Sequence, residues 1–234
     1  LVDSPRPQKT DMQTLDATQV RQLIRSTSDH RLGALVMLAA VTGIRQCELL
    51  GLRWSDVELS QGLKEDDSKR KNLHSERDDG VIHIRRTLRA CRGGFEFGEP
   101  KTSRSKRTIV IRPYVVSRLR THRAKQMEEM LAIGPSWNHS DLIFTNTIGG
   151  HLTPQNFLRR DFKPMLEYAG LPDVNFHSLR HTAATLALNQ GVSVVDVSAM
   201  LGHANSHITL TTYAHLMPGS GDRTAAAMES AIFG

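Results

Sequence analysis

Cysteine, aromatic side chains and long apolar stretches are all scarce in this sequence of 234 residues. Its two cysteines, Cys47 and Cys91, provide neither a disulfide framework nor a CxxC metal motif, so we expect a reducing, cytoplasmic environment. The longest apolar stretch, Gly33 to Val41, is much shorter than the roughly 20 residues of a membrane-spanning helix. We expect a buried core helix there, and neither a secreted disulfide-rich domain nor a membrane partner.

The N-terminal residues lack the apolar core of a signal peptide. Residues 1–14 are polar and contain two prolines, which indicates the remnant of a linker. Apolar content elsewhere is ordinary for a globular protein. The sequence therefore predicts one domain over residues 15–234.

Positive charge is in excess. The formal net charge is +6 and the pI is about 9.6, which favours a polyanionic partner such as nucleic acid. Mild basicity is common among cytosolic proteins, so motifs must decide whether that partner is DNA.

Helical patterns occupy most of the chain. Asp16 and Gln19 have the spacing of a capping box at the start of the first helix. A central apolar helix is expected from Arg31 to Val41, and Thr42-Gly43 ends it. Further helices are expected over 45–50, 114–131, 153–170, 178–189, 193–201 and 207–216, with a tail helix over 222–234.

Three runs have strand character, namely Val81–Ala90, Phe95–Phe97 and Arg107–Arg112, and a turn at residues 91–94 joins the first two. The polar, aperiodic residues 61–80 predict a mobile inserted loop. The expected fold class is α+β, mainly α-helical, with a small three-stranded antiparallel sheet on one side.

Four short segments carry the residues with chemical meaning. They are TGIRQCEL at 42–49, EPKT at 99–102, HSLRHT at 177–182, and LGH at 201–203 with Tyr213 ten residues later. In this order and spacing they resemble the tyrosine recombinase (phage integrase) family, and the resemblance covers nearly the whole chain. It implies the DNA breaking-rejoining fold and site-specific cleavage and rejoining of DNA through a 3′-phosphotyrosine intermediate, with no cofactor.

The resemblance assigns six catalytic residues: Arg45, Lys101, His177, Arg180, His203 and Tyr213. Forked guanidinium groups suit the negative charge that develops on a phosphate during cleavage. Tyr213 would attack the phosphorus, with His177 handling the phenolic proton and Lys101 protonating the departing 5′-oxygen. His203 would hydrogen-bond the phosphate.

Two residues are expected to support this set. Glu48 matches an acidic position of the family and would orient the first arginine, and His181 would pack or bind backbone near the active centre. His181 follows His177 by four residues, and His207 follows His203 by the same spacing, which also suits zinc. No further ligands complete such a site, so no metal is predicted.

Basic residues outside the catalytic set are expected to contact the DNA backbone, although a solvated charged face explains any one of them nearly as well. They are Arg85, Arg86, Arg89, Arg104, Lys106, Arg107, Arg159 and Arg160.

The expected partners are double-stranded DNA and further protomers in a DNA-bound tetramer, joined through the tail helix. Two alternatives stay open. One is a type IB topoisomerase-like enzyme, which relaxes DNA by the same chemistry. The other is a DNA-binding accessory protein without cleavage activity.

Overall fold

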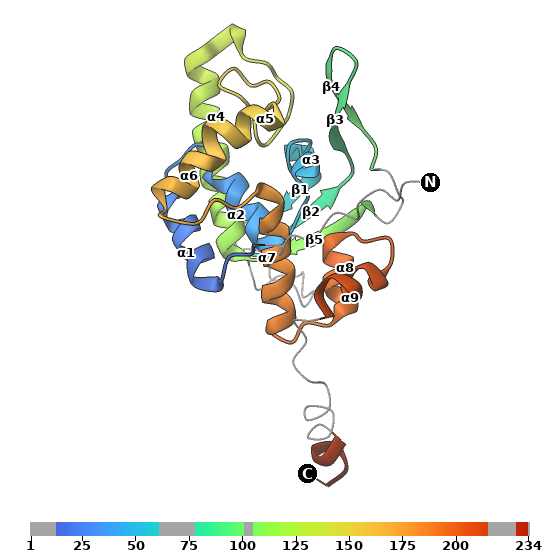
Figure 1. Cartoon of the computed structure of the whole chain (residues 1–234). Coiled ribbons are helices and arrows are strands. Elements are labelled where there is room, and N and C mark those ends of the chain that lie inside the picture. The colour runs from blue at the N-terminus through green and yellow to red at the C-terminus, as the bar shows by residue number, and fades with distance from the viewer. Residues whose placement is uncertain (1–12, 61–77, 101–104, 215–227, 234) are drawn as a thin grey trace, which may run out of the picture.

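The computed structural model describes residues 13–60, 78–100, 105–214 and 228–233 (Figure 1). Helices form most of this part, and two small antiparallel sheets lie to one side of them. The α+β, mainly helical prediction is confirmed. Among the described residues, no helix is long and apolar enough to cross a membrane.

The first helix starts as its capping pattern predicts. Helix α1 spans Ala17–Ser26, and the Asp16 side chain accepts hydrogen bonds from the backbone of Thr18 and Gln19. The Gln19 side chain accepts in return from the Asp16 backbone N–H at 2.9 Å. Both halves of the capping box are present, which satisfies N–H groups that a helix start leaves unpaired.

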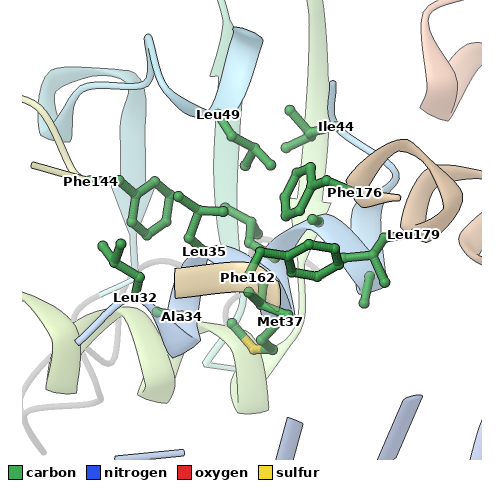
Figure 2. Close-up of a cluster of buried hydrophobic side chains, with 14 of the residues drawn as sticks. Leu32, Ala34, Leu35, Met37, Ile44, Leu49, Phe144, Phe162, Phe176 and Leu179 are labelled. Carbon is green, nitrogen blue, oxygen red and sulfur yellow. The ribbon is translucent and has the colours of Figure 1, made fainter. Parts of the chain in front are cut away.

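Helix α2 (Gly33–Thr42) is the centre of the main hydrophobic core. All of its residues except Val41 are buried, and it packs against α1, α4 (Pro113–Ile133) and α7 (Phe176–Asn189). Figure 2 shows Leu35 among aromatic and aliphatic side chains from several elements, including Phe144, Phe162 and Phe176. This core fixes the ends of α2 and α7.

The strands differ in detail from the prediction. The three-stranded sheet has the order β1 (Val57–Leu59), β2 (Gly80–Ile84), β5 (Arg107–Ile111). In a separate two-stranded sheet, β3 (Thr87–Cys91) pairs with β4 (Gly94–Gly98). The expected strand 81–90 is therefore two strands. It breaks at Arg85-Arg86, where both side chains pair with the buried Asp56.

Strand β1 was not predicted because it is short and follows directly on a 3-10 turn, Trp54–Asp56. Gly80, expected in the inserted loop, is the first residue of β2 and pairs with Leu59 and Ile111. Residues 61–77 of that loop lie outside the described residues.

The expected helix over 153–170 is interrupted. Helix α5 (Pro154–Phe157) continues into a π-helical turn, Leu158–Phe162, and then α6 (Lys163–Tyr168). Pro164 has no N–H for the regular α-helical ladder, and a π turn is one way to accommodate that loss. Gly170 then ends the helix with a left-handed φ of 62°.

The C-terminal helices form a second, smaller cluster. Helix α3 (Gln46–Leu49) belongs to the main core, whereas α8 (Val194–Leu201) packs on α7 and α9 (Ser206–Tyr213) packs on α8. Ser193 caps α8, as predicted. The buried members of this C-terminal cluster are Ala184, Leu188, Val197, Leu201 and Tyr213.

The last described residues, 228–233, are helical and lie apart from the body of the molecule in Figure 1. This agrees with a helical tail over that part of the predicted range 222–234. Its apolar side chains Met228, Ile232 and Phe233 are exposed. A short 3-10 turn, Gly134–Ser136, follows α4.

Candidate active site

The chemically interesting segments converge where α7 meets the α2–α3 connection, beside the α8–α9 turn. The α2–α3 connection provides Arg45, the first turns of α7 provide His177, Arg180 and His181, and the end of α9 provides Tyr213. His203 lies in the α8–α9 turn. Lys101 lies outside the described residues, as does Arg104, so their expected roles stay predictions.

Arg180 is a buried cation with one nitrogen left over. Arg180 is only 4% exposed, and its Nη1 donates a hydrogen bond to the Gly43 carbonyl at 2.7 Å. Within the part of the chain that the structure describes, its buried Nη2 has no hydrogen-bond partner. Burial, with Arg45 and Arg107 nearby, lowers the pKa of Arg180 to about 9. An anion bound at Nη2 would supply the missing hydrogen-bond acceptor and would reduce the repulsion between Arg180 and the two other arginines.

The backbone conformation of Gly43 directs its carbonyl toward Arg180. It ends α2 with φ of 64°, a left-handed conformation that glycine adopts without strain. A Cβ atom at this position would lie 2.7 Å from Leu201 Cδ2, so α8 packs directly over the glycine.

Glu48 is the buried carboxylate of the site, with 1% exposure. Its Oε1 accepts from Arg45 Nη1 at 2.9 Å, and its Oε2 accepts from the Arg45 backbone N–H at 3.0 Å. Burial alone would raise the pKa of Glu48, but hydrogen bonds and charge from Arg107 and Arg45 outweigh it and lower the pKa below its usual value. Glu48 thus contacts Arg45, and its role in orienting that arginine stays a prediction.

Arg107 is not on the surface, where a residue that grips DNA was expected. Its side chain is 7% exposed and forms an ion pair with Glu48 at 2.9 Å. Strand alternation is the reason, because Arg107 shares the inward face of β5 with the buried Ile109 and Ile111. That period-two pattern was available in the sequence and could have indicated the burial.

Tyr213 is buried in the C-terminal cluster, with 3% exposure. Its hydroxyl lies 2.7 Å from Nδ1 of His181, and the His181 ring packs edge-on against His177 with centroids 4.9 Å apart. Burial raises the pKa of Tyr213 to about 12, only partly offset by Arg180. Among the described residues, the hydrogen-bond partner of the phenol is therefore His181, which also packs near the active centre, one of its two expected roles.

The histidines of the site favour their neutral forms. Burial, together with His177 and Arg180, lowers the pKa of His181 to about 4, and burial with Arg180 and Arg45 lowers that of His203 to about 4. Partial burial and the same two arginines also lower the pKa of His177. Neutral imidazoles can accept a hydrogen bond from the phenol, but their lowered pKa values make them weak bases until a negative charge, such as a bound phosphate, raises those values.

His203 borders an open pocket of about 420 Å³ beside Arg45. Nδ1 of His203 lies 2.7 Å from Oγ1 of Thr209, which is fully buried on α9. This contact fixes the ring so that its other nitrogen is available to a ligand. Thr209 was missed because nothing in the sequence marks a threonine six residues after the histidine. The pocket also contains Arg89.

The other predicted DNA contacts fall into two groups. Arg85 and Arg86 pair with the buried Asp56, although Arg85 stays exposed. The second group is exposed and, among the described residues, lacks a buried ion-pair partner: it consists of Lys106, which pairs with the exposed Glu99 at 3.0 Å, and Arg159 and Arg160 on the π turn.

No group of three or more His, Cys, Asp or Glu side chains among the described residues is arranged to hold a metal ion. His181 and His203 direct Nδ1 to Tyr213 and Thr209, respectively.

The chain is similar to known recombinases over most of its length. The model of the phage integrase family matches residues 13–219. A tyrosine recombinase XerC-like protein of Caldanaerobacter subterraneus subsp. tengcongensis is 33% identical over 217 residues, which cover 90% of this chain and 52% of that protein. An integrase of Streptomyces ambofaciens is 28% identical over 211 residues, covering 89% and 49%. The chain thus spans about half the length of these curated relatives.

Two solved structures share the fold. The XerA recombinase superposes with a TM-score of 0.62 at 21% identity, covering 97% of this chain and 66% of that one. The Tn1549 transposon integrase in complex with a circular intermediate DNA gives 0.68 at 19% identity, covering 95% and 67%.

Proposed function

Because the chain belongs to the phage integrase family of tyrosine recombinases, we propose that it cleaves and rejoins DNA at a specific site through Tyr213. One observation carries the proposal most directly. The buried Nη2 of Arg180 has no partner among the described residues, and Arg180 is close enough to Tyr213 for its charge to act on the phenol. A backbone phosphate between them would supply the missing acceptor and the electrophile.

The proposed reaction exchanges one ester for another. The Tyr213 oxygen forms a bond to phosphorus while the bond from phosphorus to the 5′-oxygen breaks, which leaves a 3′-phosphotyrosine and a free 5′-hydroxyl. The phenolic proton passes to a neutral histidine, and Lys101 gives a proton to the departing oxygen. Rejoining reverses these steps with a new 5′-hydroxyl. The ester bond energy is conserved, so no nucleotide or metal is needed.

Arg45 and Arg180 would bind the non-bridging phosphate oxygens, with His203 as a further donor. Arg45 is the more accessible of the two arginines, because it lines the pocket and its side chain is 30% exposed. Arg180 is buried and keeps its Nη2 without a partner among the described residues. Donors from several side chains would hold the phosphate in a defined orientation.

Tyr213 must leave its buried position before it can attack. Its phenol is covered by the C-terminal cluster and bound to His181. We infer that His181 holds the phenol in the resting enzyme, and that DNA binding releases it toward His177, whose ring lies next to His181. His177 is then the general acid–base residue of the cleavage step.

The proposed partners are double-stranded DNA and other protomers in a DNA-bound tetramer. Arg89 in the pocket and the exposed Lys106, Arg159 and Arg160 are the described candidates for backbone contacts. The exposed apolar face of residues 228–233 is suited to docking on a neighbouring protomer. DNA is the substrate and both cysteines are free, so the cytoplasm is the proposed location.

Covalent capture tests this function. The chain is incubated with a pool of nicked duplexes of random sequence, and the DNA that becomes attached under denaturing conditions is sequenced. We expect a defined core site and a phosphotyrosyl peptide containing Tyr213 in the mass spectrum. The Tyr213→Phe variant should bind the selected DNA but form no adduct. A wild-type chain that binds without any adduct would instead support the accessory-protein alternative.

Sequence selectivity separates the enzyme from a topoisomerase. We expect adducts on the selected core site, and only slow relaxation of supercoiled plasmids that lack it. Rapid relaxation of any supercoiled plasmid would favour the type IB alternative.

A further inference from the structure

We propose that Arg107 is a positioning residue for DNA cleavage, which holds Arg45 in its phosphate-binding orientation through Glu48. This inference rests on the proposed function and adds a residue to its machinery. Arg107 comes from β5, outside the four segments that carry the expected catalytic set.

Arg45 and Arg107 each donate hydrogen bonds to both oxygens of the Glu48 carboxylate. Glu48 Oε1 accepts from Arg45 Nη1 at 2.9 Å and from Arg107 Nη1 at 3.1 Å. Glu48 Oε2 accepts from the Arg45 backbone N–H at 3.0 Å and from Arg107 Nη2 at 2.9 Å. Both oxygens of a residue with 1% exposure are therefore shared between the same two arginines.

Each of the three side-chain nitrogens of Arg107 donates a hydrogen bond within the protein. Its Nε donates to the Met200 carbonyl at 2.7 Å, Nη1 donates to Glu48 and, at 3.3 Å, to the Ser105 carbonyl, and Nη2 donates to Glu48. Its side chain is 7% exposed, compared with 30% for Arg45. Arg107 therefore faces the carboxylate, and Arg45 faces the pocket.

Arg107 also contacts the C-terminal end of α8, next to the α8–α9 turn, through the Met200 carbonyl. Met200 directly precedes the end of α8, and Arg45 Nη2 donates to the carbonyl of Gly202 at 3.2 Å in the same turn. Gly202 has φ of 66°, and a Cβ atom there would lie 2.8 Å from Arg107 Nη1. Arg107 thus packs against the segment that leads into His203.

Removing Arg107 should affect cleavage through electrostatics as well as packing. Glu48 would remain buried, with Arg45 as the main cation to balance it. A buried carboxylate that loses one of two cations binds the other more strongly. Arg45 would then be held on Glu48 at the expense of its contact with phosphate. The Met200 carbonyl would also lose a hydrogen bond.

Geometry favours arginine over lysine in this role. A planar guanidinium can bond both carboxylate oxygens and still use Nε for a third acceptor, whereas an ammonium group is a single point of charge. The Arg107→Lys variant should therefore restore part of the function, because it returns the charge without the fork. Arg107→Met keeps an unbranched aliphatic side chain and removes both the positive charge and the forked donor groups.

The test is a double-mutant cycle on the rate of covalent adduct formation. Wild type, Arg45→Met, Arg107→Met and the double variant react at saturating concentration with a nicked duplex of the core site captured by wild type. The single-turnover rate constant and the adduct yield are recorded separately. Partial misfolding lowers the yield but leaves the rate constant of the folded fraction unchanged, so the rate constant reports positioning.

We expect Arg107→Met to lower the rate constant by roughly 10- to 100-fold, below the 100- to 1,000-fold typical of losing a direct transition-state donor. In the Arg45→Met background the same change should cost less than about 3-fold, because a residue acting through Arg45 has nothing left to position. Arg107→Lys should fall between wild type and Arg107→Met. If Arg107→Met does not fold, Arg107→Lys takes its place in the cycle.

Arg112→Met is the matched control. Arg112 directly follows β5, but it pairs at the surface with Asp79 and its side chain is 60% exposed. We expect its rate constant to stay within about 2-fold of wild type, as for a surface ion pair of little energetic weight.

The outcomes separate the two proposals. If wild type forms the Tyr213 adduct, and Arg107→Met either cleaves at the wild-type rate or slows both backgrounds equally, the positioning role is overturned and the proposed function stands. If wild type forms no Tyr213-dependent adduct, the proposed function itself fails.

Discussion

The two hydrophobic clusters of this protein differ in size and in what they hold. The main core surrounds α2 and includes side chains from α1 to the start of α7, whereas the C-terminal cluster has five buried members and contains Tyr213. Helix α7 joins them, with Leu179 in the main core and Ala184 in the C-terminal cluster. Arg180, which we propose to bind phosphate, thus directly follows a residue of the larger core, and Tyr213, the proposed nucleophile, belongs to the smaller one.

This division suits the proposed chemistry. Stability varies within a protein, and elements with few buried contacts open at lower free-energy cost than the centre of a large core. An anion clamp works best when it is rigid, because its donors are already in place when charge develops. A buried nucleophile must instead be able to move. The comparison therefore predicts that α8 and α9 open locally while α2 and the first half of α7 stay folded.

Matched truncations in the two clusters give the largest expected effects. Leu35 and Leu201 are both fully buried, one in each cluster. We expect Leu35→Ala to lower the free energy of unfolding by about 3–5 kcal/mol, and Leu201→Ala by about 2–3 kcal/mol. Urea denaturation measures both values. Native-state hydrogen exchange should show faster exchange in α8 and α9 for Leu201→Ala, with α2 unchanged. Equally faster exchange in α2 would contradict separate stability of the clusters.

The contact between the two clusters can be broken at Gly43. An alanine there would have a left-handed φ, which costs about 1–2 kcal/mol, and would displace Leu201, which adds about 1–3 kcal/mol. Gly170→Ala is the control, because φ is 62° but the nearest atom to a Cβ is 4.0 Å away. The midpoint of thermal unfolding should fall more for Gly43→Ala. Equal shifts in the two variants would show that packing of α8 on Gly43 contributes nothing.

The pH dependence of stability tests the electrostatics of the smaller cluster. His181 and His203 have pKa values lowered to about 4, against 6.5 in an unfolded chain. Between these values the unfolded state binds more protons, so the free energy of unfolding is full above pH 6.5 and falls as the pH approaches 4. We expect the free energy of unfolding of the double variant His181→Gln/His203→Gln to fall by about 1–2 kcal/mol less than that of wild type over this pH range. The expected difference is this small because both rings are partly exposed and solvent screens their charges. Denaturation at pH 7.5, 5.5 and 4.5 measures it, and an unchanged slope would contradict the assignment.

The smallest expected effect is stabilisation by inorganic phosphate. An anion at a concentration ten times its dissociation constant stabilises the folded state by about 1.4 kcal/mol. Phosphate should raise the unfolding midpoint of wild type relative to chloride at equal ionic strength, and Arg180→Gln should lose most of the difference. A rise of the same size in Arg180→Gln would mean that phosphate binds elsewhere.

Local sequence signals predicted most of the fold. Asp16 and Gln19 marked the start of α1, Ser193 marked the start of α8, and continuous apolar character identified α2 as central. The strand pairing was harder. Arg85-Arg86 looked like the middle of one strand, and the break there depends on Asp56, which is distant in sequence. Tertiary contacts of this kind leave no local pattern.

The candidate site shows the same limit. The motifs identified Arg45, Arg180 and Tyr213, and the structure brings these segments together. They did not show that the phenol of Tyr213 is bound to His181 or that Thr209 fixes the ring of His203, because both contacts depend on how α9 packs. The burial of Arg107 was predictable from the alternation along β5, but its pairing with Glu48 was not, since the two residues come from different elements.

The shared carboxylate also sets the charge balance of the site. Arg45, Arg107 and Arg180 are positive and Glu48 is negative, so these four described residues carry a net charge of plus two with the histidines neutral. A phosphodiester brings one negative charge and leaves an excess of one positive charge. The five-coordinate transition state brings about two negative charges, which balance the net charge of the four residues. In the proposed reaction, this positive excess would bind the transition state better than the substrate, because the transition state carries more negative charge, and only such a difference accelerates cleavage.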